Sequence, residues 1–260
     1  MVTAFHQRGY CRFPADPALA HWVKAAHGAA LADLQNPAKS DWRCGGTWFA
    51  GVNALENDGA GAVAASGPLL GAAVSFIRDH LGHHLNWERA QLSCIRPGYP
   101  QPDPAETPAA GAYRRNRDAA HVDGLLPIGP QRRRMIREPH AFILGLALTD
   151  CAPGAAPLVV WDGSHRIMRA AFQAVLSLHD PAHWPQIDLT DAYHAARRRC
   201  FADCTRVALP IRPGEATLLH RLALHGVAPW ADGADAPPEG RIIAYFRPEL
   251  ATIAQWLTAP

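Results

Sequence analysis

The chain has 260 residues, of which 48% are hydrophobic and 18% are charged, and its formal net charge is +2. This composition predicts a globular protein of one large or two small domains and excludes a disordered tail or a fibre. Because positive and negative charges nearly balance, we expect neither nucleic acid nor a membrane as the main partner. A small-molecule substrate is the better expectation.

The cysteines and the apolar segments indicate a compartment. Six cysteines are spread along the chain without a CxxC pair, so the pattern suggests neither a zinc ribbon nor a thioredoxin-like redox centre. The first residues contain no apolar run typical of a signal peptide. The most apolar segments reach about half of the roughly 18 residues that a membrane span needs. We therefore expect a soluble cytoplasmic protein, and the sequence leaves its oligomeric state open.

The first 90 residues are predicted to be helical. Apolar residues recur at helical intervals over residues 17–34 and again over residues 68–85, and the second segment starts with a proline, which suits a first helical turn. We expect two helices here.

From residue 91 the pattern changes to that of strands. Short runs rich in branched and aromatic residues are bounded by Gly, Pro and Asp: QLSCIRP, HAFILGLALTD, PLVVWDG, TRVALPI, EATLLHRLALHG and RIIAYFRPEL. Two helices are expected between them, at residues 164–178, where Ser164 is the expected N-cap, and at residues 191–204. The predicted class is mainly β with flanking helices (α+β), with a helical insertion at residues 164–204.

Residues 97–108 contain five prolines in twelve positions and are predicted to form a long loop that continues through the small, basic residues 109–117. Long loops in compact domains often cover a site, and this one leads directly to a polar segment.

That polar segment is His121-Val122-Asp123. Residues i and i+2 of a strand project to the same face, so the imidazole and the carboxylate are placed to bind one metal ion together. Chance supplies about one His-x-acid triplet in a chain of this composition, so the motif alone is weak. A solvated histidine and aspartate at a strand end is the alternative.

Downstream histidines strengthen the metal interpretation. His220 and His225 lie in one predicted strand, and Arg241 opens the next. Two histidines and one carboxylate form the face that holds Fe(II) while three coordination positions stay open. An arginine one strand further on offers a fixed fork for a carboxylate. Since His220 and His225 are five residues apart, only one of them is expected to meet His121.

Residues 91–248 resemble the phytanoyl-CoA dioxygenase family of Fe(II)/2-oxoglutarate-dependent oxygenases. The resemblance rests on His121-x-Asp123, on ALTDCAPGAAPLVVWDGSHR, on LLHRLALHG and on the later Arg241. It implies one domain over residues 1–260, with a double-stranded β-helix, or jelly roll, at residues 91–250 and residues 1–90 packed on this barrel.

The resemblance also implies a site and a reaction. His121, Asp123 and His225 are implied as iron ligands, Arg241 as the anchor of the distal carboxylate of 2-oxoglutarate, and Arg96 as a second group that lines the cosubstrate pocket. O2 and a small organic molecule are the implied substrates, with hydroxylation and release of succinate and CO2. Because halogenating relatives lack the carboxylate ligand, the presence of Asp123 favours hydroxylation.

Two departures from the family affect the cosubstrate site. Val227 stands where the family has a hydroxyl residue, so no second anchor is visible, and the connection from His225 to Arg241 is longer than usual. Two other classes of function stay open. One is a cupin-like enzyme that uses a metal without oxidation, and the other is a small-molecule binding barrel without turnover.

Overall fold

The computed structural model describes residues 1–36, 41–83 and 85–259. A seven-stranded antiparallel sheet dominates the molecule, with strand order β1-β10-β7-β12-β4-β3-β2. Its strands are β1 (Tyr10–Phe13), β10 (Ala216–His220), β7 (Phe142–Ala147), β12 (Arg241–Phe246), β4 (Gln91–Ile95), β3 (Trp48–Gly51) and β2 (Trp42–Arg43). The strand runs predicted around residues 91–95, 142–147 and 241–246 are therefore confirmed.

A smaller sheet lies against one face of the large one. Its order is β11-β8-β9, formed by β11 (His225–Val227), β8 (Leu158–Trp161) and β9 (Arg206–Leu209). An antiparallel bridge between His121 and His225 extends this sheet beyond β11. A separate hairpin, β5 (Leu125–Ile128) with β6 (Arg133–Ile136), follows and was not predicted from the sequence.

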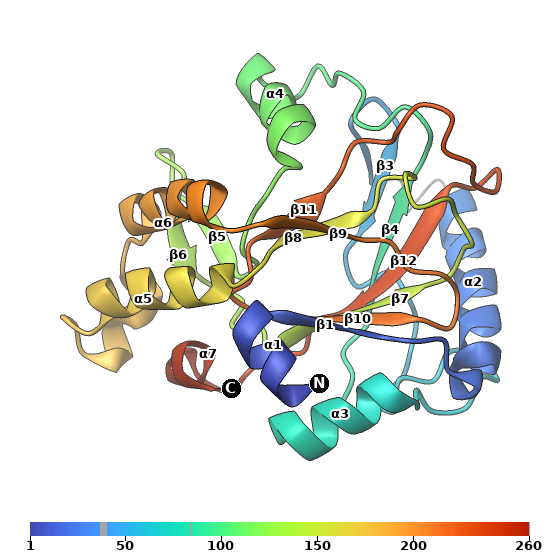
Figure 1. Cartoon of the computed structure of the whole chain (residues 1–260), viewed down its shortest axis with the longest axis horizontal. Coiled ribbons are helices and arrows are strands. Elements are labelled where there is room, and N and C mark those ends of the chain that lie inside the picture. Colours follow the sequence, from blue (N-terminus) through green and yellow to red (C-terminus); the bar gives the residue numbers. More distant parts are fainter. Residues whose placement is uncertain (37–40, 84, 260) are drawn as a thin grey trace.

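Helices cover the outside of the sheets (Figure 1). They are α1 (Val2–Arg8), α2 (Ala20–Gln35), α3 (Ala72–Leu81), α4 (Pro108–Arg117), α5 (Ser164–Leu176), α6 (Thr190–Asp203) and α7 (Ile253–Thr258), with 3-10 turns at Pro17–Leu19 and Pro181–Gln186. Among the described residues, no helix is both long and apolar enough to cross a membrane.

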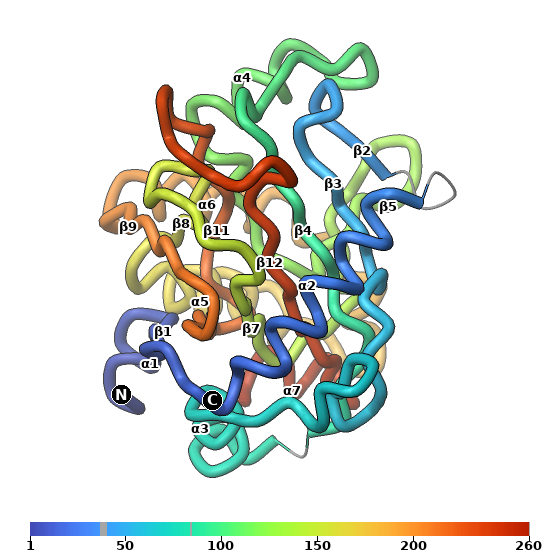
Figure 2. Tube along the Cα trace, turned by 90° about the vertical axis from the view of Figure 1, so that its right-hand side faces the viewer, coloured from blue at the N-terminus to red at the C-terminus, as the bar shows by residue number. Residues whose placement is uncertain are grey.

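The main core lies between the outer face of the large sheet and helices α2 and α3. Trp22 of α2 contacts Phe246 of β12, and Phe76 of α3 contacts Phe13 of β1. Figure 2 shows α2 running across that face. Full burial of each such side chain contributes roughly 1.5–3 kcal/mol, so this layer holds the sheet rigid. The opposite face of the sheet is left to face the smaller sheet.

The N-terminal region corrects one expectation. The two predicted helices are present as α2 and α3, but residues 1–90 also supply strands β1, β2 and β3 to the large sheet. The region is therefore not purely helical. These strands are short and lie at the two edges of the sheet, so their alternation extends over too few residues to be detected.

The insertion and the proline-rich loop also differ in detail. Ser164 is the first residue of α5 and not its N-cap, which is Gly163, because the Ser164 hydroxyl instead accepts the backbone N–H of Leu224. Residues 108–117 are a helix and not a loop. Thr107 caps this helix by accepting from Ala110 N, and Pro108 occupies its first turn, a position that favours proline.

Candidate metal centre and carboxylate pocket

Three of the predicted residues converge at the edge of the smaller sheet. Asp123 Oδ1 lies 3.1 Å from His121 Nε2 and 3.8 Å from His225 Nε2. One ligand atom from each residue lies within 4.8 Å of the other two, and within the described ranges this is the one group of three His, Cys, Asp or Glu side chains that meets this geometry. The expected convergence of His121, Asp123 and His225 is therefore observed.

The two imidazoles are oriented by main-chain carbonyls. His121 Nδ1 donates to Ala119 O at 3.0 Å and His225 Nδ1 donates to Ala223 O at 2.9 Å. With the proton on Nδ1, Nε2 is the atom through which each neutral imidazole can bind a metal ion, and both Nε2 atoms face Asp123. When the His121 ring is protonated, its Nε2–H donates to Asp123 Oδ1 instead. Such second hydrogen bonds are typical of histidines that bind metals.

The backbone before His121 adopts an unusual conformation that brings it to His225. Asp118 and Ala119 both have positive φ angles, 55° and 52°. The Asp118 carboxylate is held by two hydrogen bonds from Arg206 of β9, at 2.7 and 2.9 Å. Since Ala119 supplies the carbonyl that orients His121, this turn is part of the site.

Sterics explain why glycine follows His225. A Cβ at position 226 would lie 2.1 Å from Asp118 O, so only glycine allows β11 to approach the turn this closely. The backbone N–H of Val227 then donates to the same carbonyl at 2.9 Å. The His-Gly pair is therefore a packing requirement of the strand that carries His225.

The charges at the site favour a cation. Burial raises the pKa of Asp123, but the hydrogen bond from His121 and the nearby charges of His225, His121 and Arg247 outweigh it and hold this pKa well below the usual value. Burial, with the neighbouring His121, lowers the pKa of His225 to about 4. At neutral pH Asp123 and His225 therefore offer a carboxylate and a neutral imidazole, both in the form that a metal ion binds. Burial lowers the pKa of His121, but the hydrogen bond to Asp123 and its charge outweigh burial and raise this pKa, so a metal ion would displace the proton of this ring. The side chain of His121 is 50% exposed, so the group opens to solvent on that side.

His220 does not reach this group. The structure splits the predicted strand of residues 215–226 into β10 and β11, which belong to different sheets. His220 is buried beside α5, where Arg169 Nη2 donates to its Nε2 at 2.8 Å. The expectation that only one of the two histidines meets His121 holds, but the reason is a change of sheet and not the alternation of a single strand.

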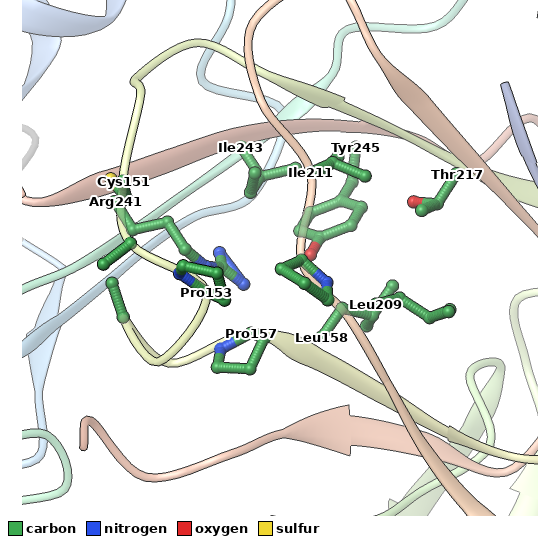
Figure 3. A pocket seen from close by; sticks show the side chains of 13 residues that line it. Cys151, Pro153, Pro157, Leu158, Leu209, Ile211, Thr217, Arg241, Ile243 and Tyr245 are labelled. Atoms are coloured by element: carbon green, nitrogen blue, oxygen red, sulfur yellow. The ribbon is translucent and has the colours of Figure 1, made fainter. Parts of the chain in front are cut away.

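Arg241 lies inside the molecule at the other end of β12. Its side chain is buried, and Nε donates to Ala156 O at 2.9 Å, whereas Nη1 has no hydrogen-bond partner among the described residues. The guanidinium points into a cavity between the two sheets, together with the hydroxyl of Tyr245 (Figure 3). Thr217 also lines this cavity, and its other walls are mostly apolar: Ala152, Pro153, Ala155, Pro157, Leu158, Leu209, Pro210, Ile211 and Ile243, with Cys151 at the rim.

Strand β12 connects this cavity with the histidine–aspartate group. Arg241, Ile243 and Tyr245 alternate along its inner face, and Arg247 follows in the same alternation. Arg247 Nη1 lies 3.3 Å from Asp123 Oδ2. Strand β12 therefore begins with Arg241, which lines the cavity, and is followed by Arg247, which contacts the candidate metal ligand Asp123.

Arg96 is not brought to this cavity. Ile95 pairs with Arg241 and shares its inner face, so the next residue points the opposite way. The Arg96 side chain is exposed, with its guanidinium carbon 3.8 Å from the ring centroid of Trp42. Arg96, expected to share a pocket with Arg241, therefore does not line the cavity that Arg241 lines.

The hydroxyl groups of Tyr245 and Thr217 in the cavity and the contact of Arg247 with Asp123 were not predicted from the sequence. The first and last of these were detectable in part, because RIIAYFR places residues 241, 245 and 247 on one face of a strand. Thr217 gave no such signal. Its position beside the cavity follows from the pairing of β10 with β7, which brings it opposite Gly145.

Comparison with solved structures finds proteins of similar fold. The non-heme alpha ketoglutarate dependent carbocyclase SnoK from nogalamycin biosynthesis aligns over 95% of this chain and 82% of its own, with a TM-score of 0.54 and 16% identity. AviO1 from Streptomyces viridochromogenes Tue57 aligns over 96% and 94%, with a TM-score of 0.52 and 15% identity. No family model and no curated protein matches the sequence. At these identities the likeness shows a shared fold.

Proposed function

We propose that the chain is an Fe(II)/2-oxoglutarate-dependent oxygenase built on a double-stranded β-helix. Strands β10, β7, β12 and β4 of the large sheet face the His121 bridge, β11, β8 and β9, which is the arrangement of two opposed four-stranded layers that such a barrel needs. The convergence of His121, Asp123 and His225 at the edge of this barrel carries the proposal.

The donor set suits iron. Two imidazole nitrogens and one carboxylate oxygen on one face are the ligands of non-haem Fe(II) oxygenases and leave the remaining positions for cosubstrate and oxygen. His121, Asp123 and His225 would hold the ion, and the carbonyls of Ala119 and Ala223 keep both imidazoles in the required tautomer.

The cavity beside Arg241 suits the distal carboxylate of 2-oxoglutarate. A buried guanidinium with an unpaired Nη1 is costly unless an anion compensates it, and a carboxylate accepts a charge-assisted hydrogen bond of this kind. The hydroxyl groups of Tyr245 and Thr217 line the same cavity and would replace the anchor that Val227 does not provide. Apolar walls exclude water and strengthen these contacts.

When bound, Fe(II) together with 2-oxoglutarate and O2 would supply oxidising chemistry that hydroxylates a C–H bond of a small organic substrate and releases succinate and CO2. The chain orients these groups. Arg241 fixes one end of the cosubstrate inside the barrel, and the ligands fix the ion at the edge, where half-exposed His121 borders solvent. SnoK is named as a carbocyclase, so this fold is also found in an enzyme that closes rings. The structure of the product distinguishes these outcomes.

The decisive test is release of succinate from 2-oxoglutarate by the purified protein with Fe(II) and ascorbate. We expect slow succinate formation without a prime substrate, and none after Asp123→Ala, because that variant loses the one carboxylate of the site. Metal binding without succinate would instead support the non-oxidative cupin-like enzyme. Binding of neither metal nor 2-oxoglutarate would support a barrel without turnover. Succinate formation at the wild-type rate by Asp123→Ala would remove Asp123 from the ligand set.

A further inference from the structure

The two oxygens of Asp123 face different partners. Oδ1 lies 3.1 Å from His121 Nε2 and 3.8 Å from His225 Nε2, whereas Oδ2 lies 3.3 Å from Arg247 Nη1. The side chains of Asp123 and Arg247 are only 12% and 18% exposed, so solvent screens this ion pair weakly. The carboxylate is therefore divided between the two imidazoles on one side and the guanidinium on the other.

We propose that Arg247 is a positioning residue, which holds Oδ2 and so leaves only Oδ1 of Asp123 for the metal ion. This inference rests on the proposed function. A carboxylate binds a cation through one oxygen or through both, and the second oxygen would take up a position that 2-oxoglutarate or O2 requires. A charge-assisted hydrogen bond from arginine opposes that rotation of the carboxylate.

The backbone at Arg247 is held by hydrogen bonds. Its carbonyl accepts a hydrogen bond from His140 Nδ1 at 2.9 Å, and the carbonyl of the following Pro248 accepts from Ala141 N at 2.7 Å. The nearby carboxylate of Glu138 lies beside His140, with 3.3 Å between Glu138 Oε2 and His140 Nε2. The backbone at Arg247 is therefore held in place while its guanidinium contacts the carboxylate of Asp123.

The neighbourhood supplies a matched control. Arg247 lines a polar cavity with Glu138, His140, Tyr245 and Arg89. The Arg89 side chain is exposed, and its Nη1 lies 3.8 Å from Glu56 Oε1. Loss of Arg89 removes one positive charge from the same cavity without touching Asp123. A general electrostatic effect and a specific contact can therefore be separated.

The experiment uses Co(II) as the probe, so that no turnover is needed. Wild type, Arg247→Gln, Arg247→Lys and Arg89→Gln are titrated with Co(II) while the visible absorption bands of the ion are recorded, and 2-oxoglutarate is then titrated into each Co(II)-loaded protein. We expect Arg247→Gln to shift the Co(II) bands and to weaken Co(II) binding about 10–100-fold, the usual effect of losing a partner of a metal ligand. We also expect it to weaken 2-oxoglutarate binding to the Co(II)-loaded protein. Arg247→Lys should lie between this variant and wild type, and Arg89→Gln should match wild type.

Each other outcome has a defined meaning. Wild-type Co(II) bands together with wild-type affinity for 2-oxoglutarate in folded Arg247→Gln would overturn the role of Arg247 and leave the proposed function intact. Failure of the wild-type protein to bind Co(II) would overturn both. If Arg247→Gln does not fold, Arg247→Met removes the charge from a side chain of similar length and is judged by the same two readouts.

Discussion

Two pairs of histidines in this molecule have nearly the same ring geometry but different surroundings. The ring centroids of His121 and His225 are 4.6 Å apart with an interplanar angle of 50°. Those of His165 and His220 are 4.8 Å apart with an angle of 42°. Close approach of two imidazoles therefore does not by itself identify a metal site.

The third partner distinguishes the two pairs. His121 and His225 share the carboxylate of Asp123, which attracts a cation, and one ring is half exposed. The second pair has Arg169 as a partner and is buried. Burial, together with the positive charges of Arg221 and Arg169 and the neighbouring His165, holds the pKa of His220 well below its usual value.

It follows that the sign of the neighbouring charge decides which histidine pair suits a metal ion. A cation at the second pair would be repelled by two arginines, and both of its rings are buried. The first pair offers both a compensating charge and an opening. This contrast also explains why the candidate ligand is His225, although His220 lies only five residues away.

Exchange of each histidine in turn gives the largest expected effect. His225→Gln should lower the affinity for Co(II) by more than the roughly 10–100-fold that a lost supporting hydrogen bond costs, because it removes a ligand. His220→Gln should leave this affinity unchanged and lower the melting temperature, since a smaller side chain replaces a fully buried ring that contacts Arg169. Calorimetric titration with Co(II) checks both. The reverse pattern would make the second pair the metal site.

A smaller effect is expected at the opposite end of β12. Arg241→Ala should weaken 2-oxoglutarate binding by about 1.5–3 kcal/mol, the usual contribution of a hydrogen bond to a charged group, which corresponds to roughly 10–150-fold. Metal affinity should not change, since Arg241 lies in the cavity and not at Asp123. Arg96→Ala is the matched control, because Arg96 is exposed on Trp42. Equal losses in both variants would contradict the assignment of Arg241.

The sequence predicted those parts of the fold whose signal is local. Buried strands such as residues 142–147 have the continuous apolar sequence that predicts a strand. His121 and Asp123 were predicted as metal ligands from their residue types and their spacing of two. The reason given for that spacing was incomplete. His121 forms only an isolated bridge, and Asp123 lies in the turn that follows it.

The remainder depended on partners that are distant in the sequence. Arg206 holds Asp118 from 88 residues away, and Arg247 reaches Asp123 from 124 residues away. No local pattern distinguishes these arginines from the other basic residues of the chain. The break between β10 and β11 was not predicted for a related reason. LLHRLALH has the pattern of one strand, and only the pairing of β10 with β7 and of β11 with β8 shows that the chain passes from one sheet to the other.

The last prediction concerns the buried pair, His165 and His220, and the pH dependence of protein stability. Burial, opposed in part by the hydrogen bond to the His6 carbonyl, lowers the pKa of His165 to about 4. The unfolded chain binds this proton near the ordinary value of about 6.5 and the folded chain does not. Stability from this group is therefore complete above pH 6.5 and is lost as the pH falls toward 4, by about 2 kcal/mol between pH 7 and pH 5.

Urea unfolding of wild type and His165→Gln at pH 7 and pH 5 measures this difference. Glutamine keeps an N–H donor for the His6 carbonyl but has no proton to take up, so its loss of stability on acidification should be about 2 kcal/mol smaller than that of wild type. Carboxylates elsewhere contribute equally to both proteins and cancel in the comparison. An identical pH dependence would mean that the folded and unfolded chains bind this proton equally, and would contradict the lowered pKa of His165.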